Sequence, residues 1–163
     1  MKDLIRTCVK TTELHVNSND IRSTMGDAID HKLKKEMEGM CCDDGYVMKD
    51  SVDIIERSMG KIVNVNNHSK VLYTIKYTCS ILSPVKGCEI DCYINSVTKM
   101  GAVAFIKHGA QVDFRESPLL IIIPKVYSPS ADTLEENKRF KVEVVATRLK
   151  YKSAQIHVVA KLV

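Results

Sequence analysis

The sequence predicts two small modules, an α+β module over residues 1–81 and a β-barrel over residues 82–163. Three observations support this division. A run over residues 71–82 places apolar or aromatic side chains at every second position, which is the period of a strand with one buried face. The turn-like segment Ser83–Gly87 follows this run, and every later run has the character of a strand. The joint between the modules is therefore expected near Pro84.

The first module is predicted to place one helix on an antiparallel sheet. A first strand is expected over residues 7–16. Ser18-Asn19-Asp20 offers capping side chains for a helix that ends near Glu38, before Gly39. Gly26 inside this helix lowers its stability by roughly 1 kcal/mol relative to alanine. The apolar face of the helix comprises Ile21, Met25, Ala28, Ile29, Leu33 and Met37. Further strands are expected over residues 46–48, 52–56, 61–65 and 71–82.

The second module reads as five strands with no long helix. The strands are expected over residues 88–97, 102–106, 119–123, 140–149 and 154–162. Their number and the size of the module match the OB-fold, a five-stranded barrel that commonly binds oligonucleotides. A small barrel of the SH3 type is the alternative that the sequence leaves open.

Charge is unevenly divided along the 163 residues, although the net charge is only +4. Residues 1–69 hold 10 Lys and Arg against 12 Asp and Glu, whereas residues 70–163 hold 14 against 8. A basic second half suits contact with nucleic acid, beside a first half that meets protein. The longest apolar run, residues 119–123, is far shorter than a membrane helix requires, and no secretory leader is recognisable. We therefore expect no membrane partner and an intracellular protein.

Neither a metal site nor catalysis is predicted. Two of the six cysteines are adjacent and three lie in predicted strands, so we expect reduced thiols. No Cys-x-x-Cys pair exists, which argues against structural zinc. The five histidines are scattered, Asp43-Asp44-Gly45 reads as an ordinary turn, and no phosphate-binding loop or hydrolase motif occurs. No cofactor is therefore expected.

Several short motifs occur together in a characteristic order. They are Glu38-Gly39-Met40-Cys41 followed by Gly45-Tyr46-Val47, then Val71-Leu72-Tyr73, Lys76-Tyr77, Pro84-Val85-Lys86-Gly87, Val97 to Gly101, and Ala146-Thr147-Arg148 within Val142 to Leu149. In this order, over about residues 11–163, they resemble the large stalk subunit of multi-subunit DNA-directed RNA polymerases. That family comprises the seventh subunit of polymerase II, its counterparts in polymerases I and III, and its archaeal counterpart.

The resemblance implies a non-catalytic subunit, with polymerase chemistry in other chains. A tip containing Gly39, Cys41, Gly45 and Tyr46 would bind the polymerase core. A smaller stalk subunit would form a heterodimer with the first module and its junction with the barrel, and the exposed edge of the long strand at residues 71–82 is a candidate docking site for it. The barrel would guide nascent single-stranded RNA. The protein would work in the nucleus if it is cellular and eukaryotic, or in the host cytoplasm or virion if a large DNA virus encodes it.

The RNA-binding candidates are cationic and aromatic residues of the predicted barrel. Family members often have an aromatic in the second barrel strand, where this chain has Ala102-Val103-Ala104 and offers Phe105 two places after Val103 on the same face. Arg148, Lys150 and Lys152 alternate toward a turn and could track phosphates. Packing of Tyr93 and Phe105 against neighbouring side chains is the alternative to base contact, and it is slightly favoured. The complete set is Tyr93, Lys99, Phe105, Lys107, Lys138, Arg139, Lys141, Arg148, Lys150, Tyr151 and Lys152.

Two other functions remain open on the sequence. A free-standing OB-fold factor of translation or RNA processing would bind RNA with a steep salt dependence and would not need the segment Glu38 to Val47. An enzyme of unknown class would bind a metal or nucleotide tightly.

Overall fold

The structure, a computed structural model, describes residues 4–20, 25–107 and 113–163. The chain forms two compact units. Among the described residues, the helix–sheet unit falls within 7–38 and 47–81, and the barrel unit falls within 4–6, 39–46 and 82–163. The chain passes from one unit to the other between Ile81 and Leu82, and residues 39–46, which the predicted division assigned to the first module, group with the barrel.

The main sheet is built around one long central strand, β6 (His68–Leu82). The sheet has the order β1-β6-β3-β2, and β4 and β5 also pair with β6. The bounds of its other strands are β1 (Ile5–Asn17), β2 (Cys41–Cys42), β3 (Gly45–Val47), β4 (Asp53–Arg57) and β5 (Lys61–Val65). Every strand predicted in the first module is present, and the short strand β2 is an addition.

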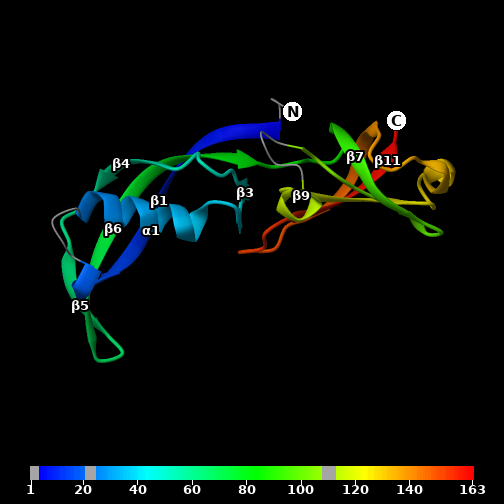
Figure 1. Ribbon diagram of the computed structural model, residues 1–163. Helices are drawn as coiled ribbons and strands as arrows, with labels where there is room; N and C mark the ends of the chain where they lie inside the picture. Colours follow the sequence, from blue (N-terminus) through cyan, green and yellow to red (C-terminus); the bar gives the residue numbers. More distant parts are fainter. Residues whose placement is uncertain (1–3, 21–24, 108–112) are drawn as a thin grey trace. The chain divides into compact units, whose positions relative to one another are not determined.

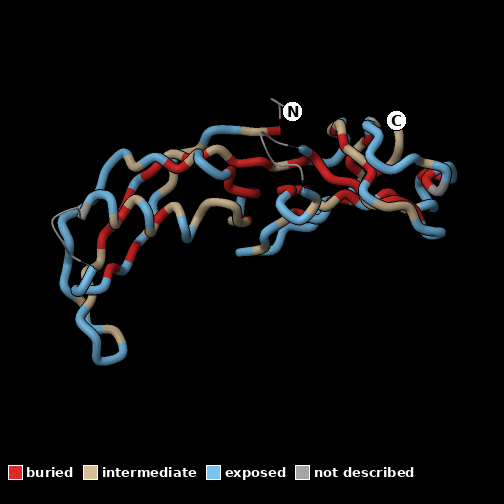
Figure 2. The backbone as a smooth tube through the Cα atoms, viewed as in Figure 1, coloured by how far each residue is buried: buried red, intermediate tan, exposed pale blue. Residues whose placement is uncertain are grey.

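The expectation that β6 offers an exposed edge to a partner is wrong. β6 pairs with β1, β3, β4 and β5, and its register with β5 and β4 runs from Val65↔His68 to Asp53↔Thr78. Side-chain alternation shows which face of a strand is buried. The predicted buried face of β6 is confirmed, since alternate residues from Tyr73 to Ile81 are at most 6% exposed (Figure 2). Backbone pairing leaves no trace in this alternation, so the edges could not be inferred.

The helix α1 is described over Met25–Met37, and its C-terminal end lies within one residue of the predicted end at Glu38. Ser18–Asp20 forms a separate 3-10 turn, η2, and the predicted helical residue Ile21 lies outside the described residues. Ile29 and Leu33 of the predicted apolar face are almost fully buried, and α1 runs alongside β1 and β6 (Figure 1).

The C-terminal end of α1 is fixed by two features. Gly39 has φ 73°, the left-handed conformation that commonly ends helices, as its position predicted. The carboxylate of Glu38 accepts hydrogen bonds from the backbone N–H groups of Ser51 and Val52, at 3.1 and 3.0 Å. The segment that leads into β4 is therefore held against the end of the helix.

The barrel contains the five strands that were predicted. They are β7 (Glu89–Thr98), β8 (Gly101–Phe105), β9 (Leu119–Pro124), β10 (Arg139–Arg148) and β11 (Ile156–Leu162). They close in the order β10-β11-β9-β8-β7, with β11 inserted between β9 and β10 and parallel to β9. This Greek-key order is that of the OB-fold. The barrel is therefore an OB-fold, and the SH3-type alternative is excluded. Two 3-10 turns, η3 (Phe114–Glu116) and η4 (Pro129–Thr133), lie in the connections.

The barrel interior is filled by alternating aliphatic side chains. The inward residues, each at most 2% exposed, are Ile90, Cys92, Ile94, Ala102, Ala104, Leu119, Ile121, Ile123, Val142, Val144, Ile156, Val158 and Ala160. Alternation in the last strand is therefore confirmed. In the part of the chain that the structure describes, no helix combines the length and apolarity needed to cross a membrane.

Candidate functional site

The tip segment, residues 39–46, is a small hairpin whose key side chains face inward. β2 and β3 pair antiparallel, with Cys41 opposite Tyr46. Cys41 is 2% exposed and Tyr46 is 3% exposed. Burial raises the pKa of the Cys41 thiol to about 11 and also raises the pKa of the Tyr46 hydroxyl. The outward surface of the hairpin is instead its turn, Asp43 and Asp44, both exposed.

This hairpin is hydrogen-bonded to the barrel loop between β10 and β11, residues 149–155. The Cys41 N–H donates to the carbonyl of Ser153, and the Lys152 N–H donates to the carbonyl of Cys41, both at 2.8 Å. Cys41 is therefore bonded to two successive residues of the loop. The tip segment therefore fixes the path of a loop that carries three of the RNA-binding candidates.

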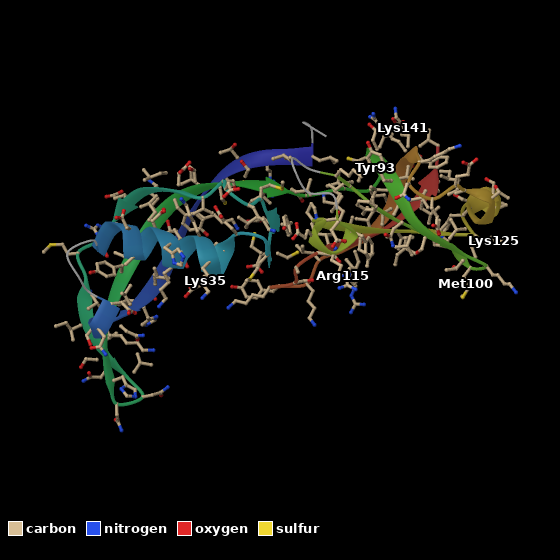
Figure 3. All side chains as sticks on the ribbon, viewed as in Figure 1. Lys35, Tyr93, Met100, Arg115, Lys125 and Lys141 are labelled. Carbon is tan, nitrogen blue, oxygen red and sulfur yellow. The ribbon has the colours of Figure 1, made fainter. Side chains whose placement is uncertain are left out.

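A second set of bonds holds the other side of the same loop. The amide of Gln155 donates to the carbonyls of Phe114 and Ser117, at 3.0 and 2.9 Å. These bonds bring η3 and the β10–β11 loop together at one end of the barrel. Arg115 of η3 thereby joins the basic residues of the loop, and Figure 3 shows it at the opposite end of the barrel from Met100 and Lys125. The sequence analysis missed Arg115 because only the fold brings η3 to this loop.

Six of the predicted cations divide into two sets with different environments. The wall triplet consists of Lys138, Arg139 and Lys141 at the start of β10. Their side chains form ion pairs with Glu135, Asp91 and Glu89, at 2.5, 2.8 and 3.1 Å. The hydrogen bond from Arg139 holds the pKa of the Asp91 carboxyl below its usual value. These three charges are largely balanced by neighbouring carboxylates.

The loop triplet consists of Arg148, Lys150 and Lys152, all exposed. Where side chains are described, no carboxylate forms an ion pair with any of the three. With Arg115 they make a cationic cluster at the end of the barrel that bonds to the tip segment. Lys99 lies apart from this cluster, in the β7–β8 turn at the other end of the barrel.

The predicted aromatic platform is reduced to one open ring. Phe105 is 4% exposed because it packs against Tyr93 and Phe114, with ring centres 6.2 and 6.0 Å away. The Lys107 ammonium lies 4.2 Å from the centre of the Tyr93 ring. Tyr151, in contrast, is 60% exposed within the β10–β11 loop. Of the three aromatic candidates, Tyr151 presents the accessible ring for stacking.

The side chains that could bind a metal are dispersed. Among the described residues, no group of three or more His, Cys, Asp or Glu side chains could hold a metal ion. All six cysteines are free thiols, and burial raises the pKa of Cys92 to about 12.

These features define a class of protein, a helix–sheet module followed by an OB-fold barrel, with a tip hairpin bonded to a basic barrel loop. No protein-family model matches the chain. The chain is similar to a protein of Acanthamoeba polyphaga mimivirus named "Putative DNA-directed RNA polymerase subunit L376". The identity is 25% over 145 residues, covering 80% of this chain and 67% of the mimivirus protein.

Proposed function

We propose that this chain is a non-catalytic stalk subunit of a DNA-directed RNA polymerase. The similarity to the mimivirus protein carries the proposal, because it supports a polymerase subunit over most of the chain. The stalk role is supported by the tip and joint motifs and by the order of a helix–sheet module before an OB-fold barrel. Catalysis would belong to the other chains of the polymerase.

In this proposal the tip hairpin docks on the polymerase core. Buried Cys41 and Tyr46 maintain the hairpin, and its exposed turn, Asp43 and Asp44, makes the contact. A smaller stalk subunit pairs with the helix–sheet module. The complex would act in the nucleus if the chain is cellular and eukaryotic, or in the host cytoplasm or virion if a large DNA virus encodes it.

The barrel would guide the emerging transcript at its tip-bonded end. Arg115 and the loop triplet supply positive charge for RNA phosphates, and the binding would weaken as salt rises. Tyr151 supplies one ring for base stacking, which contributes about 1–3 kcal/mol per base. The loop is hydrogen-bonded to Cys41 on one side and, through its own Gln155, to η3 on the other. The backbone that carries these cations and Tyr151 would therefore be held in place before RNA arrives.

The test is affinity capture of the tagged full-length chain from cells that contain its polymerase, followed by mass spectrometry. We expect the two large polymerase subunits and one small partner to be recovered at moderate salt. The double reversal Asp43→Arg with Asp44→Arg should reduce recovery of the large subunits by about tenfold, because a single polar contact with a charged group is worth roughly 1.5–3 kcal/mol.

A matched control is available at the far end of the barrel. Glu135→Arg with Glu136→Arg reverses the same number of acidic charges, and each double variant breaks one exposed ion pair, Arg6–Asp44 or Lys138–Glu135. The control should leave recovery of the polymerase unchanged. Recovery of RNA or ribosomes without polymerase would refute the stalk role and favour the free-standing OB-fold factor.

A further inference from the structure

An apolar row crosses the outer surface of the barrel. The register places Val103 of β8 opposite Ile122 of β9, Ile122 opposite Val159 of β11, and Val159 opposite Ala146 of β10. Val103, Ile122 and Val159 alternate with inward-facing neighbours, so their side chains point out of the barrel, and Ala146 follows a register shift and lies opposite outward-facing Val159. Ile122 is 38% exposed, Ala146 is exposed, and the two valines are half-buried. We call these four residues the apolar row.

The apolar row lies where OB-folds commonly bind oligonucleotides, on the second and third strands. It contains no cation and no aromatic ring. The nearest aromatic on β8, Phe105, is covered by Tyr93 and Phe114. Single-stranded nucleic acid depends on stacking and on phosphate contacts, and this row provides neither. A protein side chain is the better chemical match.

The closed barrel restricts the form that a protein ligand can take. In the described structure each of the five barrel strands already pairs with two neighbours, which leaves no whole strand edge for an added strand. A segment lying on aliphatic side chains must therefore satisfy its own backbone hydrogen bonds, as a helix does. The row crosses four strands, a width of about 15 Å at the usual strand spacing of about 4.8 Å. Apolar helix residues at i, i+4 and i+7 span about 10 Å, which fits this width.

The size of the row argues for one helix over a second copy of this chain. Four side chains across this width cover a few hundred Å² at most, well below the roughly 800 Å² per partner of a stable protein interface. A single helix with a narrow apolar stripe requires no more than this.

The charge around the row indicates what should flank that stripe. Beyond Val159 toward the tip-bonded end, the next outward pair is His157 opposite Arg148, followed by Lys150 and Lys152 in the loop. At the other end of β8 lies exposed Lys99. On the margin away from the tip-bonded end, Lys161 forms an ion pair with Glu143, so the unbalanced positive charge beside the row lies mainly toward the tip-bonded end. We propose that the apolar row binds an amphipathic helix of another protein whose apolar stripe is flanked by acidic residues.

The proposal is independent of the polymerase assignment, and a synthetic probe tests it. A labelled peptide of about 18 residues, with Leu at i, i+3, i+4 and i+7 and Glu at the flanking positions, is titrated with the full-length chain by fluorescence anisotropy. We expect saturable binding, at least tenfold tighter than that of the same peptide with Lys in place of Glu. Equal binding of the two peptides would overturn the charge complementarity.

Variants locate the binding surface. Ile122→Asp should weaken binding of the acidic peptide at least tenfold, and Ile122→Ser should weaken it less, both with an unchanged unfolding midpoint. Ile62→Asp is the matched control, since Ile62 is 80% exposed on β5 of the other unit. Three results would overturn the proposal. They are equal peptide binding by the Ile122 variants and the wild type, loss of oligo-U binding in Ile122→Asp, or a wild-type dimer that this substitution dissociates.

Discussion

Replacing each cation triplet in turn with glutamine would distinguish direct RNA contact from a general effect of surface charge. One variant replaces Arg148, Lys150 and Lys152, and the other replaces Lys138, Arg139 and Lys141. Both lose three positive charges, so their net charges are identical. The wall triplet already neutralises Glu135, Asp91 and Glu89, whereas no described carboxylate pairs with the loop triplet. Only the loop triplet is expected to displace counterions from RNA.

The size of the effect follows from counterion release. Each phosphate contact contributes about 0.7 to the slope of log K against log salt for a single strand, so losing three contacts lowers the slope by about 2. Raising salt about fourfold would then weaken wild-type binding roughly 16-fold more than binding by the loop-triplet variant. The wall-triplet variant should change the slope by less than about 0.7.

The assay is fluorescence anisotropy with a labelled oligo-U of about 15 nucleotides, titrated at several salt concentrations from about 50 to 200 mM. Circular dichroism confirms that both variants remain folded. Equal slope changes in the two variants would show that only overall charge matters. An unchanged slope in the loop-triplet variant would remove these residues from the RNA path.

Two further predictions concern the fold. Gly101 has φ 140°, and a Cβ there would lie 2.2 Å from the carbonyl oxygen of Ile123. Gly101→Ala should therefore lower the free energy of unfolding, measured in urea titrations, by about 3 kcal/mol or more. Gly26 has open space around it, so Gly26→Ala should raise the free energy of unfolding by about 0.5–1 kcal/mol. Because raised pKa values keep Cys41 and Cys92 as neutral thiols below about pH 11, iodoacetamide at pH 8 should modify them last, and early modification in peptide mass maps would contradict this.

Local periodicity in the sequence predicted most of the secondary structure. Alternation over residues 71–82 predicted β6 and its buried face, and the five later runs predicted all barrel strands to within one or two residues at each end. The predicted start of the helix, directly after Ser18-Asn19-Asp20, lies outside the described residues and stays a prediction. Strand β2, only two residues long, is too short to show a period.

The candidate site was only partly accessible to sequence reasoning. The basic residues of the β10–β11 loop were recognisable from their alternation toward a turn. Their bonds to Cys41 and, through Gln155, to η3 join segments that are far apart along the chain. Phe105 was placed on the correct face of β8, but its cover by Phe114 depends on the path of the following connection.

The sequence by itself determined the two modules, the strands and their buried faces, and the basic character of the second half. Each of these depends on residue types within a few positions of one another. The tertiary structure alone decided that β11 lies between β9 and β10, that β6 has no exposed edge, and which cations are matched by carboxylates. These outcomes depend on which backbone and side-chain groups, far apart in the sequence, pair when the sheets close. Local periodicity contains no information about this pairing.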